Sequence, residues 1–514
     1  MRLTKDVILF TTKQMPKWNP INVCSYHLQE AGATPVQELA FALATAMGVL
    51  DAVRASRQCA DEEFGEVAGR ISFFVNAGLR FITELCKMRA FTELWDEITR
   101  ERYGVTDAKQ RLFRYGVQVN SLGLTEQQPE NNVARIVLEM LAVTLSKGAR
   151  AVQLPAWNEA LGLPRPWDQQ WSLRMQQILA YETDLLDYGD IFDGSPAIAT
   201  KVAELKAAAR EELDHIEALG GTVAAVESGY LKHQLVESNS RRVEAIERGE
   251  QTVVGVNRFT ETEPSPLAQA AGAVLTVTAE AEAEQIARLN AWRESRDARA
   301  VAAALEALRK AAKSGGNIMP PSIACAKAGV TTGEWGTALR AAFGEFRAPT
   351  GVGTAMRNDA EGLDEIRAEV DRVSKRLGRR LKLLVGKPGL DGHSNGAEQI
   401  AARARDAGMD VIYDGIRLTA DAIAVAARDQ NVHVVGLSIL SGSHLPLVRE
   451  VMARLKDNGA AGVPVVVGGI IPPQDARALK DAGVVEVYTP KDFALNRIMA
   501  DLVRIVDDAV DRGK

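Results

Sequence analysis

One stretch of the chain combines a histidine, a carboxylate and several glycines directly after an apolar run. The segment KPGLDGHSNG, residues 387–396, follows LKLLV and contains His393, one of only six histidines in 514 residues. Asp391 lies two residues before it, where a carboxylate can bind one ring nitrogen and make the other a better metal donor. The glycines would let the backbone run close to a large flat ligand. These residue types indicate a metal-ligating histidine with its own supporting carboxylate.

The pattern around this segment predicts a doubly wound parallel sheet. Short β-branched runs alternate with amphipathic stretches from residue 376 onward, and five strands are expected, at 381–386, 409–415, 432–439, 463–469 and 484–489. Strands separated by single helices favour right-handed βαβ units and a flavodoxin-like domain. Ligands of such sheets bind beyond the carboxyl ends of the strands. His393 would lie at that edge, in the loop after the first strand.

Small residues recur at the ends of two further strands of this expected sheet. Ser438 and Leu440 end the third strand, and Gly468 and Gly469 end the fourth. Together they would leave a slot through the carboxyl edge of the sheet that a long, thin ligand could fill. A lone histidine in a glycine-rich turn is more often structural, so the interpretation depends on the combination of the three motifs.

The order Asp-x-His-x-x-Gly, Ser-x-Leu and Gly-Gly, at these intervals, resembles the base-off/His-on cobalamin-binding domain. The resemblance implies that His393 coordinates cobalt from below, in place of the coenzyme's dimethylbenzimidazole, and that the displaced nucleotide enters the slot. It implies cofactor contacts, direct or through the ligand histidine, for Lys387, Asp391, Gly392, His393, Gly396, Ser438, Leu440, Gly468 and Gly469.

Residues 1–245 alternate short strands with longer helices, as a (β/α) barrel does. The expected strands are 21–26, 70–77, 112–120 and 149–155, with a helix over 34–56. A complete barrel needs eight strands and about 250 residues, and only four convincing strands are found. The predicted fold is therefore α/β, with the C-terminal part of a (β/α)8 TIM barrel over 1–245, a helical connector over 246–375 and a flavodoxin-like cobalamin-binding domain over 376–514.

The segment INVCSYHLQEAG resembles the active-site segment of the methylmalonyl-CoA mutase superfamily, the adenosylcobalamin-dependent acyl-CoA mutases. The resemblance continues through RISFF, LTEQQPENN, NEALGLP and VVGVNRF and covers nearly the whole chain. It implies an intramolecular transferase that isomerises the carbon skeleton of an acyl-CoA by a radical mechanism, with the coenzyme performing the difficult step. It also implies the roles of site residues: catalysis by His27 and Tyr26, CoA-ester binding by Lys17, Arg70 and Ser72, and contacts to the adenosyl group and upper corrin face by Gln118 and Glu159.

Two stretches differ from methylmalonyl-CoA mutase proper, QLPAWNEALGLP at 153–164 and TDLLDYGDIFDGSPA at 183–197. Both resemble the branch of the superfamily that converts ethylmalonyl-CoA to methylsuccinyl-CoA, which is the expected reaction. Methylmalonyl-CoA mutase-type activity on another acyl-CoA is the alternative, because one methylene is worth only about 1–3 kcal/mol in a pocket. The competing class is a cobalamin-binding carrier or regulator without catalysis, since the first half of the barrel is not found.

Members of this superfamily continue upstream of the position that corresponds to Met1. Either the start codon is misassigned, or the chain is a fragment, or another chain completes the barrel. The expectation is that the 514-residue chain binds cobalamin but turns over little or no acyl-CoA alone. The expected partners are the acyl-CoA substrate and either a second copy in a homodimer or a chain that supplies the missing half barrel.

Composition argues against several other classes of protein. The net charge of −6 with interspersed charges gives no basic surface for nucleic acid or anionic lipid, and no uninterrupted apolar run approaches a membrane span. The four cysteines, at 24, 59, 86 and 325, show no CxxC spacing. They are typical of reduced cytoplasmic thiols, and they form no thiolate cluster of the kind that activates a methyl acceptor.

Overall fold

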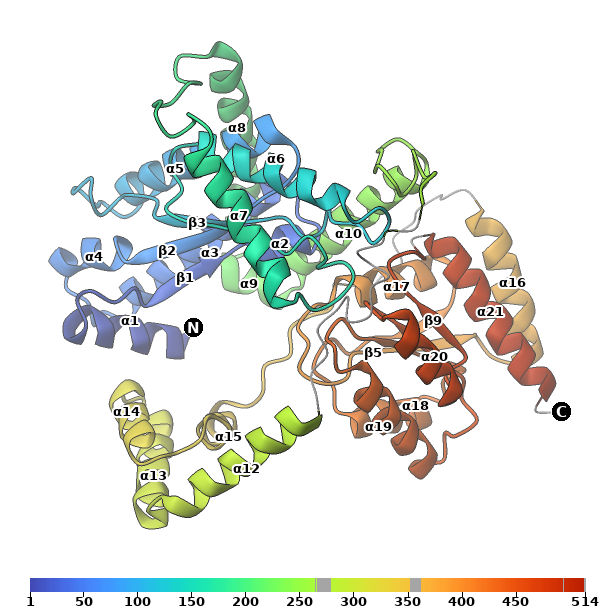
Figure 1. Cartoon of the computed structure of the whole chain (residues 1–514). Coiled ribbons are helices and arrows are strands. Elements are labelled where there is room, and N and C mark those ends of the chain that lie inside the picture. Colours follow the sequence, from blue (N-terminus) through green and yellow to red (C-terminus); the bar gives the residue numbers. More distant parts are fainter. Residues whose placement is uncertain (264, 266–278, 352–361, 493, 513–514) are drawn as a thin grey trace.

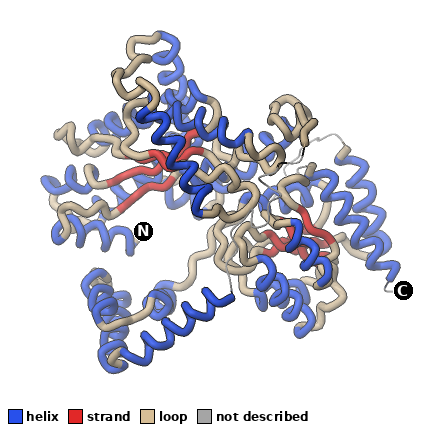
Figure 2. The backbone as a smooth tube through the Cα atoms, viewed as in Figure 1, coloured by secondary structure: helices blue, strands red, loops and turns tan. Residues whose placement is uncertain are grey.

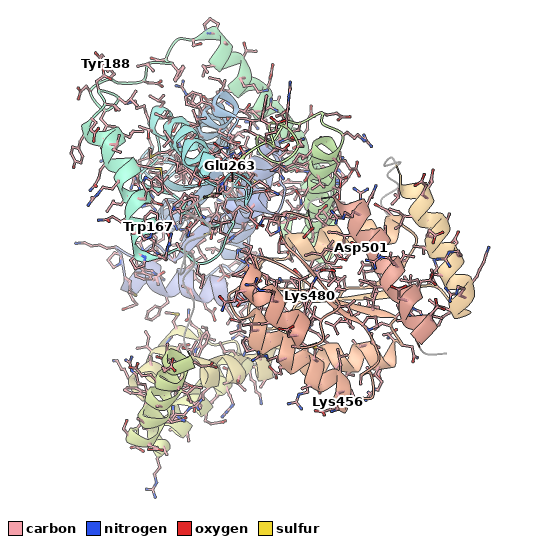
Figure 3. All side chains as sticks on the ribbon, turned by 45° about the vertical axis from the view of Figure 1, so that its right-hand side comes forward. Trp167, Tyr188, Glu263, Lys456, Lys480 and Asp501 are labelled. Atoms are coloured by element: carbon pink, nitrogen blue, oxygen red, sulfur yellow. The ribbon has the colours of Figure 1, made fainter. Side chains whose placement is uncertain are left out.

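The chain, described here by a computed structural model, forms two α/β domains and a small helical bundle (Figure 1). The structure describes residues 1–263, 265, 279–351, 362–492 and 494–512. Figure 2 shows two separate sheets, one in each α/β domain, with helices around them. Figure 3 shows the same two domains from another direction, with Trp167 on the first and Lys480 on the second.

The first domain contains a parallel sheet of four strands in the order β1-β2-β3-β4. Its strands confirm the four predicted ones: β1 (Ile21–Cys24), β2 (Ile71–Ala77), β3 (Tyr115–Val119) and β4 (Val152–Gln153). Its helices are α1 (Arg2–Gln14), α2 (Tyr26–Glu30), α3 (Pro35–Ala55), α4 (Asp61–Ala68), α5 (Phe81–Glu101), α6 (Asn131–Leu145), α7 (Pro166–Tyr181), α8 (Pro196–Ala218), α9 (Thr222–Glu227) and α10 (Tyr230–Glu247). The domain therefore has the predicted alternation of strands and helices, as an open sheet of four parallel strands.

Helix α3 shows how the sequence builds this domain. Thr34 accepts a hydrogen bond from the backbone of Gln37, the Gln37 side chain accepts one in return, and Pro35 opens the helix. Among the described residues, α3 is the one helix long and apolar enough to cross a membrane by length and composition. However, 72% of its most apolar window is buried in the protein, because α5 and α8 pack against it.

The second domain contains a parallel sheet in the order β6-β5-β7-β8-β9, which is the predicted flavodoxin-like topology. Its strands are β5 (Lys382–Gly386), β6 (Asp410–Ile412), β7 (Val434–Ser438), β8 (Val465–Gly468) and β9 (Glu486–Tyr488). Its helices are α16 (Leu363–Leu377), α17 (Asn395–Asp406), α18 (Ala420–Asp429), α19 (His444–Asp457), α20 (Pro473–Asp481) and α21 (Leu495–Arg512). Two apolar cores lie on opposite faces of the sheet, one under α16, α17 and α21 and one under α18, α19 and α20.

The helices of the predicted connector, 246–375, pack against two different parts of the protein. Its bundle consists of α12 (Ala279–Ser295), α13 (Ala298–Ser314), α14 (Met319–Lys327) and α15 (Thr332–Phe343), and it contacts α1 through Arg2, which donates to the carbonyl of Ala312 at 2.6 Å. Its last helix, α16, packs instead against α21 in the second domain. Residues 264, 266–278 and 352–361 of the connector lie outside the described residues. The predicted domain boundaries stay a prediction.

A buried charged cluster fixes the short helix α2 in the first domain. The Lys87 ammonium lies between the carboxylates of Glu38 and Glu84, and all three side chains are almost fully buried. Lys87 also donates to the Gln29 side chain at 2.7 Å, and Glu38 accepts from the Ser25 hydroxyl at 2.9 Å. Ser25 precedes α2 and Gln29 lies within it, so the cluster holds this helix at both ends.

Replacing Lys87 by Met should lower the free energy of unfolding of this domain by about 3–5 kcal/mol, because it leaves two buried carboxylates without their cation. The urea midpoint, followed by tryptophan fluorescence, measures the loss. Lys206→Met is the matched control: Lys206 contacts Glu93 and Glu97 near the surface, where an ion pair is worth about 0–1 kcal/mol. Equal shifts in the two variants would contradict the interpretation.

Candidate functional site

A cavity of about 1980 Å³ lies where the carboxyl ends of strands from both sheets face each other. The first domain contributes the turn after β1, the segments after β3 and β4, and part of α10. The second contributes the loops after β5, β6, β7, β8 and β9, and residues 344–350 of the connector also line the cavity. The cavity brings together nine of the predicted site residues: His27, Glu159, Gly392, His393, Gly396, Ser438, Leu440, Gly468 and Gly469.

The Asp391 carboxylate accepts hydrogen bonds from four donors behind this cavity. Its Oδ1 accepts from the backbone N–H of His393 at 3.0 Å and lies 2.8 Å from the ring Nδ1. Its Oδ2 accepts from the backbone N–H of Leu440 at 3.0 Å and from Lys387 at 3.2 Å. Lys387 is fully buried and also donates to the carbonyl of Ser438 at 3.0 Å. The predicted Asp391 and Lys387 therefore support the histidine rather than line the cavity.

These contacts decide which nitrogen of His393 is available. Burial alone would raise the pKa of Asp391, but the hydrogen bonds from His393 and the charge of Lys387 hold that pKa below its usual value. An ionised carboxylate only accepts, so Nδ1 of His393 carries a proton. The hydrogen bond to the same carboxylate raises the pKa of His393, and Nε2 offers its lone pair when the ring is neutral. The His393 side chain is 67% exposed and lines the cavity. Nε2 is therefore the atom that can bind a metal.

The glycines around the ligand histidine leave room for a large molecule. A Cβ at Gly396 or Gly468 would meet no protein atom within 4 Å, so a ligand has free space beside both. At Gly469 a Cβ would lie 1.8 Å from the carbonyl oxygen of Ile439, so only glycine lets β8 end so close to β7. The slot that the sequence predicted between the ends of these strands is present in the cavity.

The cavity continues below the strand ends into the second domain. Its walls there are apolar and come from β5, β8 and α21, with Val385, Val466 and Ile498 among them. The hydroxyls of Tyr413 and Tyr488 are buried in the same cavity and have no hydrogen-bond partner among the described residues. Buried hydroxyls need a partner, and the polar groups of a nucleotide can supply one. The residues present therefore fit cobalamin with its nucleotide arm inserted.

On the barrel side, His27 and Tyr26 open helix α2. The two rings are in contact, with centroids 3.8 Å apart, and Tyr26 also makes an edge contact with Phe74. Burial lowers the pKa of His27, so the imidazole is neutral near pH 7. Burial and the nearby Glu30 raise the pKa of Glu159 to about 7, so this carboxyl carries a proton for much of the time at neutral pH.

Besides Tyr26, Asp391 and Lys387, four predicted residues do not line this cavity. Lys17 is exposed between α1 and β1. Arg70 donates to backbone carbonyls of α1 at 3.3 and 3.4 Å, and Ser72 donates to a carbonyl of β1 at 3.2 Å. Both lie toward the amino end of β2, and Gln118 is half-buried in β3. Their predicted contacts with CoA and the adenosyl group stay predictions.

The structure adds cavity residues that the sequence reading did not select. Glu30 lines the cavity and accepts a hydrogen bond from Ser121 at 2.7 Å. It follows His27 by three residues, a spacing that places both on one side of a helix. Tyr413 and Tyr488 lie at the carboxyl ends of β6 and β9, so the strand-end rule that selected Ser438 would have selected them too.

The comparisons with known proteins agree with this geometry. The Methylmalonyl-CoA mutase family model matches residues 1–345 and the B12 binding domain model matches residues 381–497. Ethylmalonyl-CoA mutase of Cereibacter sphaeroides is 66% identical over 99% of this chain and 77% of the relative, and that of Methylorubrum extorquens is 64% identical over 100% and 75%. Human mitochondrial methylmalonyl-CoA mutase is 34% identical over 99% of this chain and 67% of the relative. The chain therefore belongs to the methylmalonyl-CoA mutase family and carries a B12-binding domain, which makes it a cobalamin-dependent acyl-CoA mutase.

Proposed function

We propose that the protein isomerises ethylmalonyl-CoA to methylsuccinyl-CoA with adenosylcobalamin. The observation that carries this proposal is the single cavity in which His27 and Glu159 of the barrel face His393 of the B12-binding domain. The identity of the acyl group is supported by the names of the two relatives at 66% and 64% identity, against 34% for a methylmalonyl-CoA mutase. The segments 153–164 and 183–197 resemble the same branch.

The second domain would bind the lower face of cobalamin, the face that His393 contacts. His393 would bind cobalt through Nε2, while Asp391 orients the ring and Lys387 balances the buried charge. Bound adenosylcobalamin supplies a cobalt–carbon bond whose homolysis starts the radical chemistry. The apolar slot would hold the nucleotide arm, with Gly468 and Gly469 leaving room at its entrance.

The first domain would bind the upper face of cobalamin and the substrate. As a neutral donor, His27 would bind the thioester oxygen of the substrate and stabilise the charge that develops there, with its ring held by Tyr26. Glu159, with a pKa raised to about 7 by burial and Glu30, can both donate to and accept from hydroxyls of the adenosyl group, which Gln118 would also face. Lys17, Arg70 and Ser72 would hold the CoA ester, by resemblance alone.

Two further assignments belong to this proposal. The first sheet has β1 and β4 as its edge strands, and edges of a parallel barrel sheet need cover. This supports a second chain beside the first domain, either another copy or one that completes the barrel.

The free cysteines Cys24, Cys59, Cys86 and Cys325 support a reducing compartment, and we place the protein in the cytoplasm.

Replacing His393 by Gly should abolish tight capture of adenosylcobalamin and the spectral change that accompanies it, because the axial nitrogen is gone. Asp391→Asn should weaken binding by about 10- to 100-fold, as loss of a supporting partner of a metal ligand does. Both are measured by titration followed by visible spectroscopy. His433→Gln is the control: His433 accepts from the Lys382 backbone at the amino end of β7, away from the cavity. Unchanged binding in His393→Gly would refute the ligand assignment.

The acyl group is tested by supplying ethylmalonyl-CoA and methylmalonyl-CoA to the loaded protein and measuring products by mass spectrometry. The value of kcat/KM should favour ethylmalonyl-CoA by about 10-fold or more, which is what one methylene is worth in a pocket. The assay is run on the 514-residue chain and on a chain extended at its N-terminus to the length of its relatives. An equal or reversed preference in the active form would overturn the substrate assignment.

A further inference from the structure

The loop that would ligate cobalt, residues 387–394 and here termed the ligand loop, is bound to the first domain. Helix α17 begins directly after this loop and packs against α10. Lys232 of α10 donates to the Ser394 hydroxyl at 3.1 Å and lies 2.7 Å from the Glu398 carboxylate, whose side chain is 3% exposed. One cation of the barrel domain therefore holds both the last residue of the loop and the first turn of α17.

A pair of asparagines makes a second connection. Asn239 lies two turns after Lys232 on α10 and donates to the side-chain oxygen of Asn395, the first residue of α17. Asn395 in turn donates to the carbonyl of Glu30, the last residue of α2, at 3.4 Å. Asn239 also packs on Gly32, where a Cβ would lie 2.3 Å from the Asn239 Cβ. The two amides thus join α2, which contains His27, to the start of α17, directly after the ligand loop.

The ligand loop is exposed on the cavity side. Leu390 is 89% exposed and the His393 side chain 67% exposed. Asp391 fixes the orientation of the ring relative to the loop and to β7, but not the position of the second domain relative to the first. The contacts of Lys232, Asn239 and Asn395 do cross between the domains, and Asn239 is 2% exposed, so water does not replace them readily.

We propose that Lys232, Asn239 and Asn395 form an interdomain clamp that positions His393 opposite His27 before cobalamin binds. They act as positioning residues, through the loop and α17 rather than on cobalt. This inference rests on the proposed function, because it takes His393 as the cobalt ligand. If only part of the apo protein holds a competent loop, the apparent dissociation constant rises as the inverse of that fraction. Loosening the clamp should therefore weaken binding without removing any ligand atom.

The test uses the full chain with cob(II)alamin as the probe, in Asn239→Ala and Lys232→Gln variants, with Lys232→Arg as the conservative replacement. Growth with ¹⁵N-histidine changes the nitrogen splitting in the EPR spectrum of His-bound cob(II)alamin from a triplet to a doublet, which reports the His-bound fraction directly. Loss of one buried hydrogen bond should weaken binding by about tenfold and lower the His-bound fraction. Lys232→Arg should keep most of the affinity and most of the His-bound fraction.

Glu247→Gln is the matched control at the other end of the same interface. Glu247 accepts from the Leu495 backbone at 2.9 Å and lies 3.5 Å from Arg403, near the end of α17. The Glu247→Gln substitution should leave the His-bound fraction of cob(II)alamin unchanged. Thermal melting and hydrogen exchange of the ligand loop in each apo variant distinguish local loosening, which supports the clamp, from unfolding of the domain, which counts against it.

His393→Gly separates this inference from the function on which it rests. If His393→Gly binds cob(II)alamin as tightly as the unaltered chain, the proposed function fails. If His393→Gly loses binding while Asn239→Ala and Lys232→Gln stay fully His-bound with unchanged affinity, the clamp is overturned and the proposed function stands. An equal loss in Glu247→Gln would also overturn the clamp, because the whole interface would then be responsible.

Discussion

The structure of the site depends on a single buried carboxylate, that of Asp391. A charge removed from water is costly unless it is paired and hydrogen-bonded, and Asp391 meets both conditions with Lys387 and three N–H donors. Because one donor is the backbone of Leu440, the same carboxylate ties the loop after β5 to the end of β7. The requirement to satisfy this charge therefore fixes the orientation of His393 and holds its loop against the end of β7.

Both domains use the carboxyl ends of parallel strands, and the contact between α10 and α17 turns these ends toward each other. Helix dipoles and open loop geometry make such edges the usual place for ligands in α/β proteins. Neither edge alone lines the whole cavity of about 1980 Å³. The cavity exists because two edges share it, so the interface between the domains is part of the site.

Most of the fold could be predicted from the sequence because its signals are local. The runs at 381–386 and 432–439 are short and mostly apolar, and each contains a strand. His393 and Ser438 could be selected because strand ends define the ligand edge of a parallel sheet. The domain against which α16 packs could not be predicted in this way. An amphipathic pattern shows that a helix has a buried face but not which domain buries it.

The contacts that cross between domains were missed for a related reason. Lys232 and Asn239 face α17 across more than 150 positions of chain, and no spacing in the sequence relates them to it. Lys17, Arg70 and Ser72 were selected by resemblance and not by any property of their surroundings. These three residues lie away from the cavity, which is consistent with how they were selected. A resemblance assigns a role to a residue without describing its surroundings.

The carboxyl groups on the two faces of the cavity differ in protonation state. On the lower face, the hydrogen bonds from His393 and the charge of Lys387 overcome burial and keep Asp391 ionised, and the hydrogen bond to this carboxylate raises the pKa of His393 in turn. On the upper face, burial beside Glu30 raises the pKa of Glu159 to about 7, and burial keeps His27 neutral. The number of donors around each carboxyl decides the difference. With the His393 ring neutral, the cavity presents an electron pair toward the metal side, while His27 and Glu159 present hydrogen-bond donors toward the substrate side.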